Sequence, residues 1–596
     1  MPVHRIRLAA FVLFATACTH RTPPAPLVYP EVLTPEALLP APLAVTLPPT
    51  PDAIRRLLDS LPVRAKVAQL VMPWIAGSYA AFDDAAFLRA QGWVDSLEVG
   101  GLIVSIGSPL DIAAKLNALQ RSSRLPLLIA SDLEGGSAMR FTGGTAFPTN
   151  MGVGATGREL DAYEMGRITA LEGRAVGIHL GFAPVADVNN NPFNPIINTR
   201  SFGEDPTAVA RLVAAQIRGM QEHGLLATAK HFPGHGDTGT DSHITLPVIT
   251  APWARLDSVE LVPFRAAVQS GVTAIMSAHI ALPGVDSDSL RPATVAPGIL
   301  TGILRDSLGF KGLVVTDALD MGGVVSRYGA GEAAVLAFLA GADLLLQPAS
   351  PLEAIDALTA AVGEGRVSIS RLDQSLRKVL ELKRQLGLFR RRTVALEYIP
   401  AVVGAAAHQT IARDVAARSI VLARDDGTVD SLRTGPRAVT VVAYSDDAGS
   451  AFGSTLAGEL RAAGHSVTTF RLYPPSGPAS YDSARVAIAS SPITVFAASV
   501  RVVAWSGSVS LPAAVAELID STAAKQPTLL ASFGSPYLLN QVPLVRSYLL
   551  AWGARPMNEQ AAARAIAGLA PITGHLPISL TPDLPRGSGL QREGGP

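Results

Sequence analysis

The stretch LLATAKHFPGHGDTGTDSH, residues 225–243, joins a continuous apolar run to an irregular loop rich in titratable side chains. The apolar run ends at Lys230 and His231, and Pro233 with the glycines that follow it prevents a regular helix. A continuous apolar run indicates a strand buried on both faces of a parallel sheet. The stretch therefore predicts a buried strand whose C-terminal end carries polar chemistry.

Similar apolar runs occur along the chain, with amphipathic segments between most of them. They are KVAQLVMPW (66–74), VGGLIVSI (99–106), LPLLIASDLE (125–134), GIHLGFAPVADV (177–188), VTAIMSAHI (272–280), GLVVTDALDM (312–321) and GADLLLQP (341–348). Together with the first run they make eight strand–helix units, which predict a (β/α)8 barrel of the TIM type. A doubly wound open sheet is the alternative, and the count of eight favours the barrel.

A second α/β pattern begins beyond residue 410. Its apolar runs are RAVTVVAYS (437–445), HSVTTFRL (465–472), SPITVFAASV (491–500), PTLLASFG (527–534) and RSYLLAWG (546–553). Helical patterns separate these runs, so we expect a smaller open parallel sheet within an α/β sandwich. No G-x-G-x-x-G follows a strand, which argues against a dinucleotide site.

Polar residues close most runs of the predicted barrel. They are Asp132 and Glu134, Asp187, Lys230 and His231, His279, and Asp317 and Asp320. The C-terminal strand ends of a barrel converge on one face, where active sites are built. We therefore expect these side chains to share a pocket, and the pattern predicts an enzyme.

The charge balance argues against a nucleic-acid partner. Lys+Arg and Asp+Glu both number 49, so the formal net charge is zero. The sequence therefore lacks the excess of basic residues that is typical of nucleic-acid-binding proteins, and a small or neutral partner is expected.

The N-terminus resembles a bacterial lipoprotein signal. Arg5 and Arg7 precede a short apolar stretch, and small residues lead to Cys18, the single cysteine of the chain. An incidental cysteine after an ordinary cleavage site is the alternative. We expect a signal peptide (1–17), lipidation of Cys18 and a proline-rich tether (18–52). The remaining predicted boundaries are a catalytic barrel (53–391), a linker (392–411), the second domain (412–588) and a disordered tail (589–596).

The loop after Lys230 allows three interpretations. His231, His235, Asp237, Asp241 and His243 are all metal-ligand types, but Pro233 and Gly234 break the helical i, i+4 geometry, and H-E-x-x-H is absent. The second interpretation is a purely structural role, which is expected for His235 and Asp237. The third interpretation is acid/base chemistry.

Hydrolysis of a sugar acetal requires an anion near the anomeric carbon and a proton donor for the leaving oxygen. Asp317 is the natural anion. In Asp241-Ser242-His243 a carboxylate can orient an imidazole, which titrates near neutral pH. Lys230 and His231 would then bind substrate hydroxyls.

KHFPGHG followed by DSH resembles the signature of glycoside hydrolase family 3, in its β-N-acetylhexosaminidase branch. Further stretches fit that family in the same order: SDLEGG (131–136), NPIINTRSFGEDP (194–206), IMSAHI (275–280), ILRDSLGFKGLVVTDALDM (303–321) and GEAAVLAFLAGADLLLQP (331–348). VAARSIVLARDD (415–426) and LPISL (576–580) are similar to its second domain more loosely. One departure is SDLEGGSAMR, where Leu133 replaces a polar residue and the arginine is displaced to Arg140.

The resemblance implies roles for individual residues. Asp317 matches the catalytic nucleophile, and His243 with its partner Asp241 matches the acid/base. Residues that match the first sugar subsite are Asp132, Arg200, Lys230 and His231. Glu134 and Asp320 are interpreted as structural support.

We therefore expect an exo-acting, retaining β-N-acetylglucosaminidase without metal or cofactor. It would be a monomer, lipid-anchored outside the cytoplasm of a bacterium, and would act on a GlcNAc-containing glycan such as peptidoglycan fragments. The alternatives are a β-glucosidase-like hydrolase of the same family, a GlcNAc phosphorylase, a metallohydrolase, and a glycan-binding lipoprotein with an inactive barrel.

Overall fold

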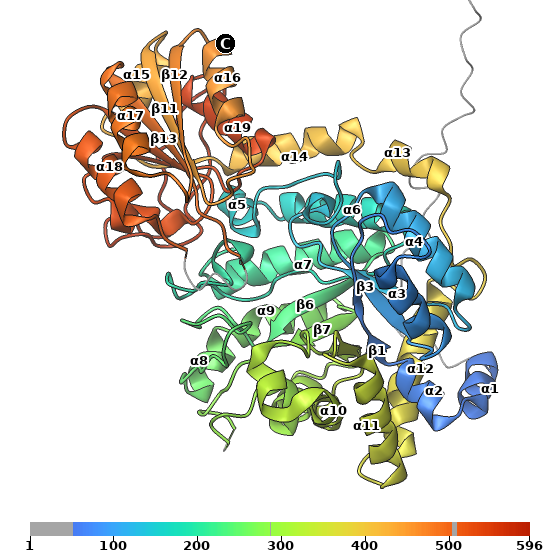
Figure 1. Ribbon diagram of the computed structural model, residues 1–596. Coiled ribbons are helices and arrows are strands. Elements are labelled where there is room, and N and C mark those ends of the chain that lie inside the picture. Colours follow the sequence, from blue (N-terminus) through green and yellow to red (C-terminus); the bar gives the residue numbers. More distant parts are fainter. Residues whose placement is uncertain (1–51, 287, 504–508, 596) are drawn as a thin grey trace, which may run out of the picture.

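The computed structural model describes residues 52–286, 288–503 and 509–595, which form two sheet-centred domains joined by a helical segment (Figure 1). The predicted signal peptide, Cys18 and the tether up to residue 51 lie outside the described residues. Among the helices that the structure describes, none combines the length and the apolarity needed to cross a membrane.

The strands of the first domain lie at the eight predicted apolar runs. They are β1 (Val71–Met72), β2 (Trp74–Ile75), β3 (Gly101–Val104), β4 (Leu128–Ser131), β5 (Leu180–Gly181), β6 (Leu226–Phe232), β7 (Ala274–Ser277), β8 (Leu313–Val315) and β9 (Leu345–Leu346). Strands β2 to β8 form a seven-stranded parallel sheet in sequence order. The prediction of consecutive parallel strands is confirmed.

Contacts between the first and last strands join the two edges of this sheet. β1 pairs with β9, and Val315 at the end of β8 forms a bridge with Leu344. β1 and β2 are one predicted strand interrupted only at Pro73, whose nitrogen carries no proton for a sheet hydrogen bond. The parallel sheet is therefore curled into the predicted barrel.

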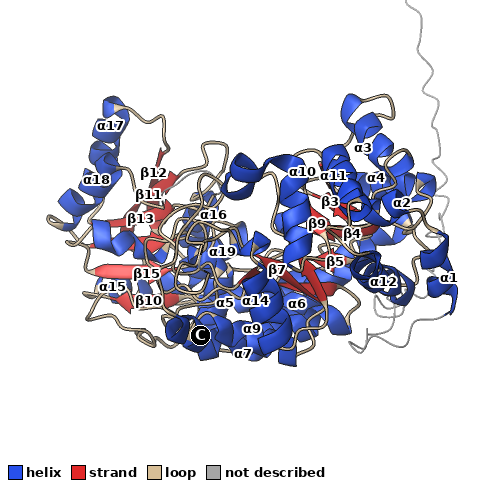
Figure 2. Cartoon of the chain, turned by 90° about the horizontal axis from the view of Figure 1, so that it is seen from below, coloured by secondary structure: helices blue, strands red, loops and turns tan. Residues whose placement is uncertain are grey.

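Helices surround the barrel strands, as Figure 2 shows. They are α1 (Asp52–Ser60), α2 (Val63–Ala68), α3 (Ala85–Asp95), α4 (Pro109–Ser122), η2 (Ser137–Met139), α5 (Asn150–Thr156), α6 (Glu159–Ala175), η3 (Asn198–Arg200), α7 (Pro206–Glu222), α8 (Trp253–Ser258), α9 (Leu261–Gln269), η4 (Ala293–Val295), η5 (Gly298–Ser307), α10 (Gly322–Ala340), α11 (Pro351–Gly363) and α12 (Ile369–Gln385). Ser108, Asp205 and Ser350 cap α4, α7 and α11 by accepting a backbone N–H, and a proline follows each cap.

The second domain contains one six-stranded sheet. Its order is β10 (Val421–Arg424), β15 (Ser547–Leu550), β14 (Thr528–Ser532), β13 (Ile493–Ser499), β11 (Ala438–Ser445) and β12 (Ser466–Leu472). Five of these strands coincide with the predicted runs. The sequence did not predict β10, a short edge strand that pairs antiparallel with β15, so the sheet is mixed rather than wholly parallel. The helices here are α15 (Thr428–Arg433), α16 (Ser454–Ala462), α17 (Pro478–Ala489), α18 (Ala513–Ala523), η7 (Pro536–Gln541) and α19 (Pro556–Ile566).

The segment between the domains is helical. The predicted linker 392–411 holds η6 (Leu396–Tyr398), α13 (Ile399–Val402) and the start of α14 (Ala406–Ser419), which runs from the barrel to the second domain (Figure 1). Residues 589–595, for which the sequence predicts a disordered tail, pack on the second domain. Arg592 pairs with Asp430, and the Leu590 N–H donates to the Leu422 carbonyl.

Direct contacts fix the second domain against the barrel. The Thr149 N–H donates to the Trp552 carbonyl at 2.8 Å, and Asn189 Nδ2 donates to the Tyr537 hydroxyl at 2.9 Å. Trp552 is fully buried, and a side chain on Gly152 would meet its Cβ at 2.5 Å. The second domain is therefore held beside the loops that follow β4 and β5.

Candidate active site

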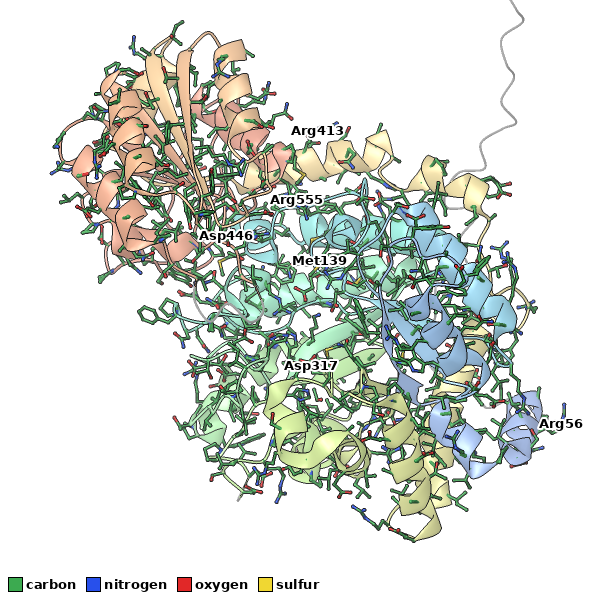
Figure 3. All side chains as sticks on the ribbon, in the orientation of Figure 1. Arg56, Met139, Asp317, Arg413, Asp446 and Arg555 are labelled. Atoms are coloured by element: carbon green, nitrogen blue, oxygen red, sulfur yellow. The ribbon has the colours of Figure 1, made fainter. Side chains whose placement is uncertain are left out.

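A cavity of about 520 Å³ opens at the C-terminal ends of the barrel strands. Six of the seven predicted site residues line it: Asp132, Arg200, Lys230, His231, His243 and Asp317. The seventh, Asp241, is buried and contacts His243. In Figure 3 Asp317 is labelled at the centre of the barrel domain. Residues as far apart in the sequence as Asp132 and Asp317 thus share one pocket.

The floor of the cavity holds a buried network of charges. Lys230 Nζ lies 2.9 Å from Asp132 Oδ1 and 2.7 Å from Glu134 Oε1. Arg200 donates from Nε and Nη2 to the two oxygens of Glu134 at 2.9 and 2.8 Å. The displaced arginine, Arg140, donates from Nη2 to Asp132 Oδ2 at 3.0 Å. Each carboxylate therefore contacts two cations.

Charge pairing outweighs burial in this network. Burial alone would raise the pKa of Asp132, but Lys230 and Arg140 lower that pKa to about 2. Burial would lower the pKa of Lys230, yet the adjacent carboxylates of Asp132 and Glu134 raise it above its ordinary value. Both groups are thus charged at neutral pH and present fixed hydrogen-bonding partners for sugar hydroxyls.

His231 is oriented by the end of the preceding barrel strand. Its Nδ1 donates to Asp187 Oδ2 at 2.7 Å, and its backbone N–H donates to Asp187 Oδ1 at 3.1 Å. Asp187 also accepts the His235 N–H at 2.7 Å, so one buried carboxylate holds the beginning of the loop.

Asp317 is an ionised carboxylate beside imidazoles. Burial would raise the pKa of this group, but His231 and His279, with the Ala318 N–H that donates to Oδ1 at 2.8 Å, lower it below its ordinary value. His243 contributes in the same direction. The carboxylate is therefore available as an anion at neutral pH.

The loop after β6 forms a carboxylate–imidazole pair. His243 Nδ1 donates to Asp241 Oδ1 at 2.7 Å, and the His243 backbone N–H donates to the same oxygen at 2.9 Å. The Asp241 side chain is fully buried, whereas 26% of the His243 side chain is exposed. The pair thus places an oriented imidazole at the cavity wall.

His235 ties this loop together. Its Nδ1 contacts Thr238 Oγ1 and its Nε2 contacts Ser242 Oγ, each at 2.9 Å. Ser242 lies between Asp241 and His243, so His235 supports the pair from behind. These contacts agree with the structural role expected for His235.

Glu134 has a larger part in the site than the sequence indicates. Instead of giving structural support alone, it lines the cavity and binds both Lys230 and Arg200. The spacing of Glu134 from Asp132 is the sequence feature that indicates this role, because residues i and i+2 at an extended strand end point to the same side. Leu133 between them is fully buried, which explains the apolar departure from the family pattern.

No group of three or more His, Cys, Asp or Glu within residues 52–286, 288–503 and 509–595 is arranged to hold a metal ion. The loop histidines instead contact separate partners: Asp187 for His231, Thr238 and Ser242 for His235, and Asp241 for His243.

A barrel with an anionic carboxylate, a carboxylate–imidazole pair and a polar floor has the features of a glycoside hydrolase. The sequence model of the glycosyl hydrolase family 3 N-terminal domain matches residues 62–382. The chain belongs to glycoside hydrolase family 3, as its sequence motifs indicated.

Relatives of the chain are named as a β-N-acetylglucosaminidase/β-glucosidase and as β-hexosaminidases. The β-N-acetylglucosaminidase/β-glucosidase of Cellulomonas fimi is 32% identical over 506 residues, which cover 81% of this chain and 88% of that protein. β-Hexosaminidase A of Pseudoalteromonas piscicida is 33% identical over 368 residues, which cover 56% and 61%.

Solved structures extend the similarity to both domains. A family 3 β-N-acetylglucosaminidase from Paenibacillus sp. str. FPU-7 has a TM-score of 0.78 and 34% identity, covering 88% of this chain and 99% of that one. The β-glucoside phosphorylase BglX has a TM-score of 0.79 and 26% identity, covering 89% and 97%.

His235 gives the protein a pH-dependent stability. Burial and the adjacent His231 lower the pKa of His235 to about 4, so the folded protein keeps this ring neutral while the unfolded chain protonates it near pH 6.5. Its contribution to stability is complete above about pH 6.5 and is lost as the pH falls toward about 4. When the pH is lowered from about 7 to about 5, the unfolding free energy of the wild type should therefore fall. The unfolding free energy of His235→Gln should fall by about 2 kcal/mol less.

Urea unfolding at the two pH values measures this difference. His223→Gln, a substitution at the end of α7 outside the cavity, serves as the control. Equal pH dependence in His235→Gln and the wild type would contradict a neutral His235.

Proposed function

We propose that this protein is an exo-acting, retaining β-N-acetylglucosaminidase that releases terminal β-linked GlcNAc. The observation that carries the proposal is one cavity lined by both the Asp317 carboxylate and the His243 imidazole, with Asp241 holding Nδ1 of that imidazole. The hexosaminidase names of the relatives support the same substrate class.

The floor network would hold the terminal sugar. Asp132 accepts from two hydroxyl groups, Lys230 donates as a point charge, and His231 presents a ring fixed by Asp187. Arg200 is already engaged by Glu134 and by the Ile196 carbonyl, so it acts with Glu134 as a preorganised pair rather than alone. Such fixed groups position the anomeric carbon over Asp317.

The first step forms a bond between a carboxylate oxygen of Asp317 and the anomeric carbon. The bond from that carbon to the leaving oxygen breaks, and His243 donates its Nε2 proton to that oxygen. In the second step the neutral imidazole takes a proton from water, whose oxygen attacks the anomeric carbon and displaces Asp317. Retention of configuration follows from the two inversions.

The buried Asp241 carboxylate stabilises the protonated imidazole when His243 carries a charge. It also holds Nδ1 as the donor to itself, so proton exchange with the substrate takes place at Nε2. The second domain contributes Val502 and Val503 to the cavity lining. In this proposal the acid/base is His243 of the barrel loop.

Substitutions at the two proposed catalytic groups should differ in their dependence on the leaving group. Asp317→Ala should reduce kcat at least about 1,000-fold on every substrate, because it removes the covalent intermediate. His243→Ala should reduce kcat/KM on chitobiose about 100- to 10,000-fold but leave kcat/KM on a dinitrophenyl GlcNAc nearly unchanged, because that leaving group needs no proton.

Initial rates on the two substrates measure this contrast. Asp320→Asn is the matched control, because Asp320 lines the same cavity but contacts Gln347. Equal damage by His243→Ala on both substrates would refute its role as the acid. Addition of inorganic phosphate tests phosphorolysis as the alternative second step, since it would yield GlcNAc 1-phosphate.

Location and substrate source are part of the proposal. We infer a lipoprotein anchored through Cys18 at the bacterial cell envelope, acting as a monomer on peptidoglycan fragments, because the N-terminal pattern and the GlcNAc specificity agree.

Cys18→Ser should abolish lipid attachment and detergent-dependent fractionation. A chain starting at residue 53 should be soluble and as active as the wild type on an aryl GlcNAc, since residues 1–52 precede most of α1 and all barrel strands. Metabolic labelling with a fatty acid and fractionation test the anchor. Labelling of Cys18→Ser equal to the wild type would refute it.

A further inference from the structure

A second cavity, here called the arginine cavity, lies between the barrel and the second domain. Its volume is about 760 Å³. It is lined by the loop from Ala138 to Ala146, by Gln409 and Arg413 of α14, by Thr455 of α16 and by Arg555, Pro556, Met557 and Gln560 at the start of α19. Elements of both domains and of the helical segment thus meet around it.

The lining of this cavity is positively charged. It contains Arg140, Arg413 and Arg555 and no aspartate or glutamate. Within the described residues, neither Arg413 nor Arg555 forms an ion pair, and Arg413 Nη2 donates to the Thr410 hydroxyl at 2.9 Å. Two arginines therefore face this cavity without a carboxylate partner.

The N-termini of α16 and α19 lie beside the arginine cavity and differ in how their charge is offset. Glu559 accepts the Gly453 and Leu456 N–H groups and so offsets the positive end of α16. The start of α19 has no side-chain cap, Arg555 occupies its N-cap position, and Glu559 in its first turn bonds to the start of α16. The positive charge at this end of α19 therefore comes from the Arg555 side chain, which lines the cavity.

The arginine cavity is a direct neighbour of the candidate active site. Met139 and Arg140 line both cavities, and Arg140 reaches Asp132 on the side of the sugar floor. Figure 3 labels Met139 between Asp317 on one side and Arg413 and Arg555 on the other. A substrate bound at Asp317 thus has the positive cavity beside it.

The wall between the cavities is held rigidly. Glu172 of α6 accepts hydrogen bonds from Ser137 and from the N–H and hydroxyl of Thr145, at the two ends of the loop. His408 of α14 donates to the same carboxylate at 2.8 Å. The loop and the helix that carry the cavity lining are therefore fixed to each other independently of a ligand.

We propose that the arginine cavity binds a carboxylate carried by the leaving-group part of the substrate. Guanidinium groups match carboxylates geometrically, and Arg413 and Arg555 are exposed at the cavity without a carboxylate partner of their own. In peptidoglycan fragments the carboxylate could come from the lactyl ether of N-acetylmuramic acid (MurNAc) or from its peptide. This inference rests on the proposed function, in which the terminal GlcNAc occupies the cavity that contains Asp317.

The test compares three substrates: chitobiose, the GlcNAc–MurNAc disaccharide and the same disaccharide with its peptide. The double variant R413Q/R555Q should lower kcat/KM on the carboxylate-bearing substrates about three- to tenfold, the range of exposed ion pairs, and leave chitobiose unchanged. Added salt should reduce the preference of the wild type for the carboxylate-bearing substrates over chitobiose. A loss on the peptide form alone would identify the peptide as the source of the carboxylate.

Arg56→Gln is the matched control, because Arg56 is exposed and lies far from Asp317, Arg413 and Arg555 in Figure 3. Equal effects of the double variant on all three substrates, or none, would overturn the inference. Calorimetric binding of GlcNAc–MurNAc separates the two proposals, because arginine-dependent binding without turnover would leave the inference standing and refute the hydrolase.

Discussion

The burial of Lys230 between Asp132 and Glu134 is the constraint on which the site depends. These groups come from the C-terminal ends of β4 and β6, which lie on either side of β5 in the sheet. Removing one partner from a buried ion pair typically costs about 3–5 kcal/mol, because the remaining charge is left uncompensated. The network therefore joins the ends of β4 and β6 into the sugar floor, and Arg140 and Arg200 extend it to the neighbouring loops.

Much of the architecture follows from apolar runs that end in polar residues. Both faces of a parallel barrel strand are buried, so its sequence is continuously apolar, and its C-terminal end is where polar groups are tolerated. This is why Asp132, Lys230, His231 and Asp317 can be grouped from the sequence alone. The pair of Asp241 and His243 is equally visible there, because the two residues contact each other within one loop.

Other features depend on contacts between distant segments and are not predictable in the same way. The binding of Arg200 by Glu134 joins two loops, and Asp187 orients His231 from the preceding strand end. The contribution of Val502 to the cavity depends on how the second domain packs. Strand β10 is not predicted from the sequence because its four residues begin one residue after α14 and pair with a strand more than a hundred positions later.

The central claim is that Asp317 forms a covalent bond to the sugar, and mass spectrometry tests it most directly. A 5-fluoro-GlcNAc donor with an activated leaving group should form an intermediate that hydrolyses slowly, because the fluorine destabilises the positively charged transition state of both steps. The account predicts an added mass of one fluorinated sugar on the peptide that contains Asp317, and none in Asp317→Ala. Turnover without an adduct, or an adduct at another residue such as Asp320, would contradict it.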